Sequence, residues 1–387
     1  MNIVFLSPHF PPNWFEFAVG LQRAGATVLG IGDAPYDELR PELRAALTEY
    51  YRVGDMATYD DLVRAMGWFT HRYGKVDHVD SLNEYWLETE AQLRTDFNVP
   101  GLHTDDVAIV KRKSLMKERF ERAGLGPARG RVCRSPAELR EFVAEVGFPV
   151  VAKPDSGVGA ARTYKLSDEV DLERYLRDKP AVDYIVEEFV SGQIVTFDGL
   201  ANSHGEVVFA TSLTLSVGVL ESVTDALDMS FFVSREIPAD LEAAGLAVAR
   251  AFDVRSRPFH FEFFRQADGS LVPLEVNMRP PGGPSVDMAN WANDIDFYRE
   301  WANVVVHDAF EAEVTRPWFV MYVGRRDVRP YLRSHEEVLE AYGSMLVHSG
   351  RIERVFSGAM GDFAYVLRHH ELEPLKAAAA WILERAP

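Results

Sequence analysis

The sequence predicts a chain of mixed fold class, α/β at its start and α+β beyond, and three observations support this. Short apolar strands alternate with helical stretches over the first hundred residues, which is typical of a parallel sheet. Residues from about 125 to 183 combine strand and helix patterns, and the chain beyond Tyr184 is rich in strands. With 387 residues, of which 47% are hydrophobic, the chain is long enough for two or three domains with real cores.

The first part of the chain, residues 1–103, is expected to form an N-terminal α/β domain. Strands are predicted at Ile3–Leu6, Thr27–Ile31 and His78–Leu82. Helices are predicted at Trp14–Ala24 and Asp60–Tyr73, the first of them amphipathic and followed by a glycine that suits a helix end.

Residues 104–184 are expected to begin with one helix that runs from Thr104 to Ala123 and stops at a glycine. A capping-box pattern at Ser135–Glu138 predicts a second helix, which ends at Gly147. A strand at Pro149–Lys153 follows it.

The remainder divides into residues 185–315, with one clear helix at Ala239–Phe252, and a tail from about residue 316. In the tail, strands are predicted at Trp318–Val323 and Phe363–Leu367. Helices are predicted at Ser334–Tyr342 and Glu373–Glu384.

The charge balance limits the classes of partner. The chain has 41 Lys and Arg against 59 Asp and Glu, a net charge of −18, which disfavours nucleic acids and anionic membranes. No apolar run approaches the roughly 20 residues of a membrane span, and the first residues lack the pattern of a signal peptide. The single Cys133 leaves no internal disulfide framework and no cysteine metal cluster. We therefore expect a cytoplasmic protein.

The most informative segment lies between Pro258 and Arg279, where two β-prone runs flank Asp268-Gly269. Asp-Gly is the preferred two-residue loop of a type I′ hairpin, so Ala267 is expected to face Ser270. This loop would set the register of the whole hairpin.

In this register Glu262 lies opposite Glu275, and His260 lies opposite Asn277. Side chains alternate between the two faces of a strand, so these four share one face with Arg279. The opposite face is expected to enter a core through Phe259, Phe261, Phe263, Leu274 and Val276.

Two carboxylates that are opposed across a ladder have Cβ atoms about 4.5–5.5 Å apart and repel each other. A hard divalent cation held by carboxylate and amide oxygens, as Mg²⁺ prefers, would compensate for this repulsion. Glu262, Glu275 and Asn277 are therefore candidate metal ligands. A solvated acidic face on an ordinary hairpin is the alternative at this point.

A second signal is a strand that ends in Lys153 and continues into a turn rich in glycine and serine. Backbone N–H groups in such turns can enclose phosphate oxygens, and a nearby lysine adds positive charge. The turn has neither the Gly-Lys-Ser/Thr ending of a Walker A motif nor the helix that follows a dinucleotide fingerprint. A plain hairpin turn is the alternative.

Two further segments are rich in charge. Lys111–Arg122 is expected to be a basic helix, most of whose charged residues form a solvated face. Glu187 and Glu188 end an apolar strand before Ser191-Gly192, at a connection where an adenine could contact backbone groups. Exposed acids at a strand end are the alternative there.

Taken in order, these segments resemble the ATP-grasp superfamily, and within it the ADP-forming carboxylate–amine ligases of the amino-acid ligase type. The motifs that carry the resemblance are Arg112–Lys117, Val151–Pro154 with its glycine turn, Val186–Gly192, Phe261–Phe263 and Leu274–Pro280. The resemblance covers nearly the whole chain. It implies an ATP-grasp fold with a Rossmann-like pre-ATP-grasp domain at 1–103, a first ATP-grasp part at 104–184 with a lid subdomain at about 125–183, an ATP-grasp core at 185–315 with the metal-binding hairpin, and a C-terminal α+β subdomain at 316–387.

The resemblance also implies roles for individual residues. The ATP-binding residues would be Lys113 and Lys153 at the α- and β-phosphates, Ser156, Gly157 and Gly159 in a turn that closes over the phosphates, Glu187 at the adenine amino group, and Glu188 and Val190 through their backbone. Glu262, Glu275 and Asn277 would hold one or two Mg²⁺ ions, or Mn²⁺. Arg279 would be the catalytic residue that steadies the γ-phosphate and the acyl-phosphate.

Two positions depart from the family's pattern. A glutamate that binds the ribose hydroxyls commonly stands two residues after the hinge glycine, where this chain has Ile194. The neighbouring Gln193 is the substitute that we expect. The acidic residue that usually precedes the first lysine is Arg112 here.

Substrate residues are sought beyond the carboxyl ends of the parallel strands, where ligands of open α/β sheets bind. In the loops at residues 7–13 and 81–84, His9 is a candidate substrate contact or base, and Glu84 a candidate partner for a substrate ammonium group. Gly282 and Gly283 lie in a proline- and glycine-rich loop beside the hairpin face that carries Glu262, Glu275 and Asn277, which we call the metal face. They could shape the pocket for the carboxylate substrate. For each of these, a loop residue without a role is the alternative.

The expected function is an ATP-dependent ligase that activates a small carboxylate as an acyl-phosphate and joins it to an amine, releasing ADP and phosphate. A homodimer is the assembly that we consider. The alternatives are a biotin-carboxylase-like enzyme that phosphorylates bicarbonate, a catalytically silent nucleotide-binding regulatory protein, and an NAD-dependent dehydrogenase. The loop after the first strand lacks the glycines that a dehydrogenase would need.

Overall fold

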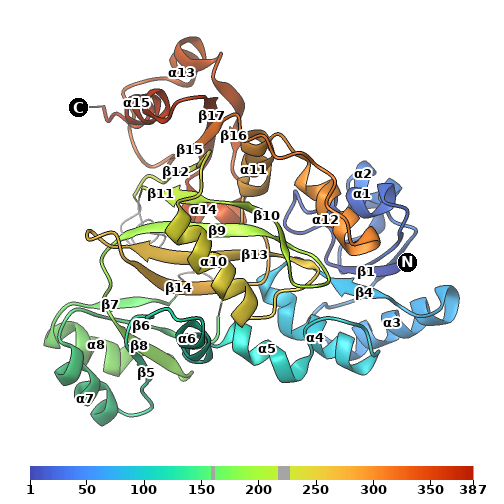
Figure 1. The fold of residues 1–387 in the computed structure, drawn as a ribbon, viewed down its shortest axis with the longest axis horizontal. Helices are drawn as coiled ribbons and strands as arrows, with labels where there is room; N and C mark the ends of the chain where they lie inside the picture. The colour runs from blue at the N-terminus through green and yellow to red at the C-terminus, as the bar shows by residue number, and fades with distance from the viewer. Residues whose placement is uncertain (158–161, 217–226, 387) are drawn as a thin grey trace.

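The structure is a computed structural model that describes residues 1–157, 162–216 and 227–386. Three sheets organise these residues: a four-stranded parallel sheet near the N-terminus, a small four-stranded antiparallel sheet, and a nine-stranded antiparallel sheet (Figure 1). The predicted mixed fold class is confirmed. None of the described helices is long and apolar enough to cross a bilayer.

The N-terminal sheet has the strand order β3-β2-β1-β4, and all of its pairs are parallel. Its central strand is buried from Ile3 to Leu6, because helices pack on both faces of the sheet. The elements of this part are β1 (Asn2–Leu6), α1 (Phe15–Arg23), β2 (Thr27–Gly32), η1 (Tyr36–Glu38), α2 (Pro41–Ala46), β3 (Glu49–Arg52), α3 (Tyr59–Tyr73), β4 (His78–Asp80), η2 (Glu84–Trp86) and α4 (Leu87–Asp96).

The single helix expected from Thr104 to Ala123 is wrong, because the structure has two helices, α5 (Thr104–Lys111) and α6 (Lys113–Arg122). The helix breaks at Arg112, whose backbone is extended and pairs with Ser156. Asp155 accepts hydrogen bonds from the backbone N–H and the hydroxyl of Ser114, at 2.8 and 3.0 Å, and so caps the first turn of α6.

The small sheet has the strand order β5-β8-β6-β7, and α7 and α8 cover one of its faces. Its elements are β5 (Gly130–Val132), α7 (Pro136–Val146), β6 (Val150–Pro154), β7 (Tyr164–Leu166), α8 (Glu169–Asp178) and β8 (Tyr184–Glu188). Ser135 caps α7 as predicted by accepting from the Glu138 N–H. The Glu138 carboxylate accepts from the Arg134 N–H, so the reciprocal half of the predicted capping box is absent between these two residues.

The nine-stranded sheet runs β14-β13-β9-β11-β12-β15-β17-β16, with β10 paired to β9. The tail thus continues the sheet of residues 185–315, and the predicted domain limits at 103, 184 and 315 stay predictions. Its strands are β9 (Gln193–Ala201), β10 (Val207–Thr211), β11 (Leu213–Leu215), β12 (Ser230–Val233), β13 (Arg257–Arg265), β14 (Leu271–Asn277), β15 (Phe319–Arg325), β16 (Leu346–Arg351) and β17 (Phe363–His369). The helices that follow β8 are α10 (Ala239–Ala251), α11 (Ser285–Asn293), α12 (Phe297–His307), α13 (His335–Tyr342), α14 (Arg354–Met360) and α15 (Leu372–Ile382).

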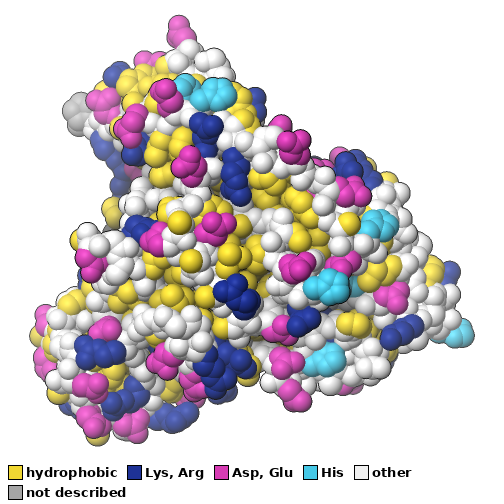
Figure 2. Space-filling view, viewed as in Figure 1, with side chains coloured by type: hydrophobic (Ala, Val, Ile, Leu, Met, Phe, Trp, Pro, Cys, Tyr) yellow, Lys and Arg dark blue, Asp and Glu magenta, His cyan; other side chains and the backbone are white. Residues whose placement is uncertain are grey.

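Helix α12 joins the large sheet's segment of the chain to the N-terminal part. It lies beside α1 (Figure 1), and the ring of Trp301 packs edge-on against Phe17 with centroids 5.3 Å apart. On the outer surface, Figure 2 shows charged side chains of both signs mixed over the visible face, with apolar side chains most prominent across its middle.

The β13–β14 hairpin has the predicted pairing at its far end but a different loop. The Gln266 N–H donates to the Ser270 carbonyl, which closes a three-residue loop, so the predicted two-residue loop is wrong. This loop shifts the register by one residue, and a β-bulge after Glu262 restores it. Leu274 is left unpaired by the bulge and lies partly buried, outside the core that it was expected to enter.

Close packing of α10 on β9 depends on Gly245. A Cβ atom at this position would lie 2.2 Å from the Phe197 ring. We predict that Gly245→Ala lowers the free energy of unfolding by about 1–3 kcal/mol in urea denaturation, because the overlap outweighs the better helix propensity of alanine. Gly67→Ala, in α3 with open space around the glycine, is the control and should stabilise by up to about 1 kcal/mol. Equal effects of the two substitutions would contradict the close packing.

Candidate active site

Three lysines of α6 and β6, two of them buried and one half-buried, are paired with carboxylates. The Glu187 carboxylate, on β8, receives the Lys117 and Lys153 ammonium groups, both at 2.6 Å. Burial would raise the pKa of Glu187, but these two cations outweigh burial and hold its pKa below the ordinary value. Lys113 reaches Glu275 on β14 at 2.9 Å. The first turns of α6 therefore connect the small sheet to the hairpin of the large one.

Most charged residues of the basic helix were expected to form a solvated face, and this is wrong for Lys111 and Lys117; Lys113, which was assigned to the phosphates, is buried as well. Lys111 and Lys113 are 6–7% exposed, and the Lys117 side chain is 13% exposed. Lys113 and Lys117 are four residues apart and share a helix face, a spacing from which sequence reasoning could have grouped them. It could not have named their partners, because those carboxylates lie on other elements.

The metal face of the hairpin is formed as predicted, with Glu262 directly opposite Glu275 and His260 opposite Asn277. Each carboxylate has its own cation. Glu275 is paired with Lys113, and the Glu262 carboxylate lies 3.1 Å from His260 Nε2. The repulsion between the opposed carboxylates is thereby reduced within the protein itself.

His260 is held from its other side by Asp198, a β9 residue that sequence reasoning missed. Its Nδ1 lies 2.6 Å from the Asp198 carboxylate, which also accepts from the Thr196 hydroxyl. Burial lowers the pKa of His260, but the carboxylates of Asp198 and Glu262 outweigh burial and raise it to about 9. His260 is therefore a cation at neutral pH in this arrangement.

The donor set of Glu262, Glu275 and the Asn277 amide oxygen fits a hard divalent cation, which prefers oxygen ligands. Over the described ranges, no three His, Cys, Asp or Glu side chains gather as a metal site. From the described residues, the protein would supply these two carboxylates and one amide. Such a partial set suits Mg²⁺, which commonly keeps waters and takes ligands from phosphates.

Arg279 lies next to the metal face. Its guanidinium donates to the Pro280 carbonyl at 2.8 Å and to the Asn277 side-chain oxygen at 3.4 Å. Among the residues that the structure describes, no carboxylate lies within 4.0 Å of it. Arg279 thus differs from the nearby lysines, each of which already has a carboxylate partner.

Beside the metal face is a cavity of about 380 Å³, which we call the apolar cavity. Glu262, His260 and Arg279 line it, together with Glu84 and Gly282. Most of the remaining wall is apolar, and its members include Phe10, Trp14, Leu215, Met229, Phe231 and Phe356.

The candidate substrate residues are not all in this cavity. His9 lies elsewhere, against Gly32 and 3.4 Å from the Asp33 carboxylate, and burial lowers its pKa. Gly283 is not among the residues that line the cavity. Its φ of +63° favours glycine there, and the Met360 side chain, whose sulfur lies 2.5 Å from where a Cβ would stand, would have to move to admit a larger residue.

The phosphate-turn residues are described in part. Ser156 pairs with Arg112, and the Gly157 carbonyl accepts from the Lys113 ammonium group at 3.5 Å. Gly159 lies outside the described residues. The roles predicted for these residues stay predictions.

The remaining ATP-binding candidates lie around the end of β8 and the start of β9. Glu188 binds Arg129 through its carboxylate, and Val190 follows half-buried. Ile194 lies on the same face of β9 as Thr196, and Thr196 pairs with Glu262, so the family's ribose position falls on the metal face. Gln193 points to the opposite face by alternation and is exposed, so the structure does not bring it to the metal face.

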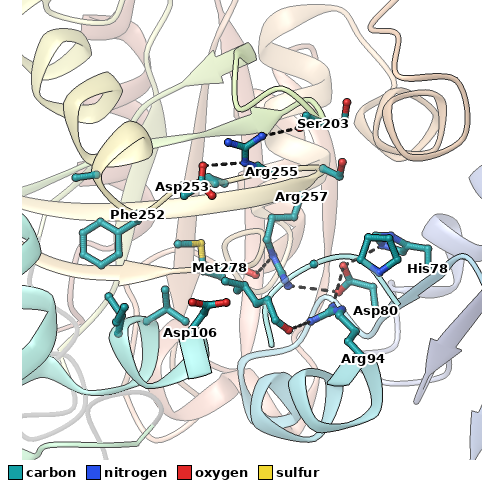
Figure 3. A pocket seen from close by; sticks show the side chains of 18 of the residues that line it. His78, Asp80, Arg94, Asp106, Ser203, Phe252, Asp253, Arg255, Arg257 and Met278 are labelled. Carbon is teal, nitrogen blue, oxygen red and sulfur yellow. Dashed lines mark hydrogen bonds and ion pairs between the residues drawn. The ribbon is translucent and has the colours of Figure 1, made fainter. Parts of the chain in front are cut away.

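A buried charged network supports both the hairpin and the loop that carries Glu84 (Figure 3). Arg257 donates to the Met278 carbonyl at 3.0 Å and lies 3.5 Å from Asp80. The carboxylates of Asp80 and Glu90 accept from the Ser81 N–H at 2.9 and 2.8 Å. Thus one cluster binds both Met278, the residue before Arg279, and Ser81, the first residue of the loop that carries Glu84.

Charges within this network are balanced. Burial and the Asp80 carboxylate raise the pKa of Glu90, and Arg94 donates to Glu90 at 2.8 Å. Burial opposes ionisation of Asp80 as well, but Arg257, His78 and Arg94 together outweigh it and lower its pKa. Asp80, Arg94 and Arg257 also line a second cavity of about 350 Å³ (Figure 3).

Removing one member of this network should leave an uncompensated buried charge. We predict that Arg257→Met lowers the free energy of unfolding by about 3–5 kcal/mol, measured by urea denaturation. Arg255→Met is the control, because Arg255 and its partner Asp253 are largely exposed, and it should cost less than about 1 kcal/mol. Similar losses from both substitutions would contradict a special role for the network.

Comparisons with known proteins agree with the fold and the motifs. Residues 146–287 match the family model described as the ATP-grasp domain. The L-arginine-specific L-amino acid ligase of Bacillus subtilis is 25% identical over 247 residues, which cover 61% of this chain and 59% of that protein. The carbamoyl phosphate synthase large chain of Mycobacterium tuberculosis is 30% identical over 190 residues, or 46% of this chain and 17% of that one. The chain thus matches less than two thirds of the length of these relatives.

The fold extends over the whole chain. The crystal structure of an L-amino acid ligase from Bacillus licheniformis superposes with a TM-score of 0.75 and 17% identity, over 98% of this chain and 96% of that one. At this identity the similarity shows the fold alone. Together with the family match over residues 146–287, it confirms the resemblance to ATP-grasp proteins that the motifs indicated.

Proposed function

We propose that this protein is an ATP-dependent ligase that activates a small carboxylate as an acyl-phosphate and joins it to an amine. The observation that carries the proposal is the opposed pair Glu262 and Glu275, with Asn277 beside them, at the edge of a cavity that Arg279 also lines. In this arrangement, the candidate ligands for a metal–polyphosphate would lie next to a space for an organic substrate.

The chemistry requires activation, because the oxygen of a carboxylate is a poor leaving group. Transfer of the γ-phosphoryl group of ATP to the carboxylate gives an acyl-phosphate, whose phosphate leaves readily when an amine attacks. A bound divalent cation would neutralise charge on the phosphates during the transfer. Lys113 and Lys153 would hold the α- and β-phosphates, and Arg279 would steady the group that is transferred.

For the nucleotide base, we keep the assignment of Glu187 to the adenine amino group and of Glu188 and Val190 to backbone contacts. In the structure, the Glu187 carboxylate is paired with two lysines, Lys117 and Lys153. Phosphates that draw Lys153 toward ATP would leave Glu187 with Lys117 and an oxygen that can accept from the base. A cytoplasmic location and a homodimer stay predictions.

The character of the cavity wall separates the ligase from its nearest rival. Bicarbonate is small and polar, and it would leave the apolar wall around Phe231 and Met229 without a ligand to cover it. Sites for organic ligands are mostly apolar and occupy about 300–1,000 Å³, as this cavity does. The apolar cavity therefore supports an organic acid over bicarbonate.

The proposal predicts ADP and phosphate release that depends on an acid–amine pair, and Glu275→Gln should reduce it at least about 100-fold, because the metal would lose a charged ligand. A coupled assay of ADP release with Mg-ATP across acids and amines measures this. Glu118→Gln, on the exposed side of α6, is the control and should keep full turnover. Nucleotide binding without turnover under every pair would favour the silent regulatory protein instead.

A second prediction concerns nucleotide affinity. Lys153→Met removes a cation from the phosphate site and should weaken binding of Mg-ADP about tenfold or more, measured by calorimetry. Lys165→Met, in the same small sheet but with its ammonium over the Phe189 ring, is the matched control and should bind normally. Unchanged affinity of the Lys153 variant would refute the assignment of that lysine to the phosphates.

A further inference from the structure

The start of α6 lies where two proposed phosphate ligands from different parts of the chain must meet. Lys113 is the first residue of α6, and Lys153 belongs to the strand β6. Two ammonium groups can bind one polyphosphate only if the elements that carry them are held in a fixed relation. The contacts between α6 and the end of β6 therefore decide whether these two lysines act together.

The first turn of α6 has no cap from its own N-cap residue. That residue is Arg112, whose side chain makes no hydrogen bond to the backbone of the turn. An arginine side chain has donors only, so it cannot accept from the free N–H groups of a helix start. Its backbone, with φ of −97° and ψ of 118°, nevertheless has the extended conformation of an N-cap residue. Position 112 thus has the backbone for a cap but not the side chain.

Asp155, directly after β6, supplies the missing acceptor. Its carboxylate accepts from the N–H and the hydroxyl of Ser114, at 2.8 and 3.0 Å. Its carbonyl accepts from the Lys113 N–H at 2.8 Å, and the next residue, Ser156, pairs with Arg112. These contacts join the beginning of one element to the end of the other.

Asp155 is itself held firmly and is buried. Its N–H donates to the Asp183 carbonyl at 3.0 Å, next to β8 of the small sheet, and the residue is 4% exposed. Within the described ranges its carboxylate forms no ion pair, so burial of its charge is costly. The positive end of the α6 dipole offsets part of this cost. A buried charge kept at a helix start indicates that the position of this turn matters.

We infer that Asp155 is a positioning residue for nucleotide binding, which caps α6 in place of Arg112. By this contact it holds Lys113 and Lys153 at one phosphate site. The inference rests on the proposed function, because that proposal assigns the two lysines to phosphates. Asp155 acts through the lysines and does not itself bind the nucleotide. Without the cap, the first turn of α6 frays and Lys113 loses its fixed position.

The effect is confined to the phosphates. Lys117, which binds Glu187 at the proposed adenine site, lies further along α6. The helix is anchored there by Met116 and Phe120, which are buried in a core shared with α10 and the large sheet. Loss of the cap therefore weakens contacts to phosphates and leaves the contacts to the base in place.

Asp155→Ala removes the cap. Its affinity for Mg-ADP, measured by calorimetry on the folded variant, should fall about tenfold, the equivalent of one hydrogen bond to a charged group. Its affinity for adenosine, measured by ligand-observed NMR, should stay unchanged, because adenosine has no phosphate. Unchanged affinity for Mg-ADP would overturn the inference. Equal losses for ADP and adenosine would mean a structural role alone and would overturn it as well.

Asp168→Ala is the matched control. Asp168 caps α8, beside the same small sheet, by accepting from the N–H groups of Val170 and Asp171 at 2.9 and 3.0 Å. Its removal should lower the midpoint of urea denaturation, as loss of a helix cap does, but leave the affinity for Mg-ADP unchanged. A similar loss of affinity in this variant would indicate general destabilisation and contradict the specific role of Asp155.

Asp155→Asn separates the cap from the charge. Asparagine caps helices about as well as aspartate, so this variant should retain most of the affinity for Mg-ADP. A loss as large as that of the alanine variant would show that the charge matters rather than the cap, and would overturn the inference.

A second substitution should restore the cap from the helix's own N-cap position. Arg112→Asn, made in the Asp155→Ala protein, brings an acceptor to a backbone that already suits an N-cap residue. It should recover most of the lost affinity for Mg-ADP. Arg112→Ala in the same background removes the same charge without supplying a cap, and it should recover none. Equal binding by the two double variants would contradict the inference.

The outcomes also separate this inference from the proposed function. If the wild-type protein does not bind Mg-ADP, the proposed function fails and the inference fails with it. If Lys153→Met weakens binding of Mg-ADP and Asp155→Ala does not, only the inference fails.

If Asp155→Ala does not fold, Ser114→Ala decides instead, because it removes only the hydroxyl that donates to Asp155. It should weaken binding of Mg-ADP but not of adenosine, and unchanged affinity for Mg-ADP would overturn the inference. Ser135→Ala, at the start of α7, is its control and should bind Mg-ADP normally.

Discussion

Glu262 and Glu275 face each other on paired strands, and the repulsion between their carboxylates shapes much of the surrounding structure. Each has a cation from a different place in the chain. His260, which is held by Asp198, pairs with Glu262. Lys113, at the start of α6, pairs with Glu275. Lys113 can reach Glu275 because α5 ends just before it. The new helix, α6, then begins beside the end of β6, where Arg112 pairs with Ser156. The break between α5 and α6 is therefore part of the same charge balance.

The same helix pair distributes lysines to three parts of the molecule. Lys111 binds Glu84 in the N-terminal part, Lys117 binds Glu187 in the small sheet, and Lys113 binds Glu275 in the large sheet. The pairs are largely buried, so removing one partner would leave a costly unpaired charge. In the proposed reaction, the phosphates of ATP would compete with these carboxylates for the lysines. The enzyme would then hold its nucleotide by exchange of ion pairs that already exist.

Several features of the candidate site could be predicted from local patterns. Alternation along β13 and β14 predicted which side chains share the metal face, and the pairing of Glu262 with Glu275 is confirmed. The reason given for that pairing was only partly right, because the loop has three residues and the bulge after Glu262 restores the register. Turn chemistry and bulge placement compensate each other here, and neither can be read separately from the hairpin's composition.

Other features could not be predicted in this way, because they depend on contacts between distant segments. The sequence alone predicted the fold class, the resemblance to ATP-grasp proteins and the side chains that share one face of the hairpin, since each rests on short-range periodicity or on motifs in order. Only the tertiary structure decided that Lys111 and Lys113 are buried, that His9 lies apart from the apolar cavity, and that Glu84 and Arg279 line it together. A local pattern specifies which way a side chain points from its own element. Which charge it meets there depends on how elements far apart in the chain pack, and that packing is a property of the whole fold.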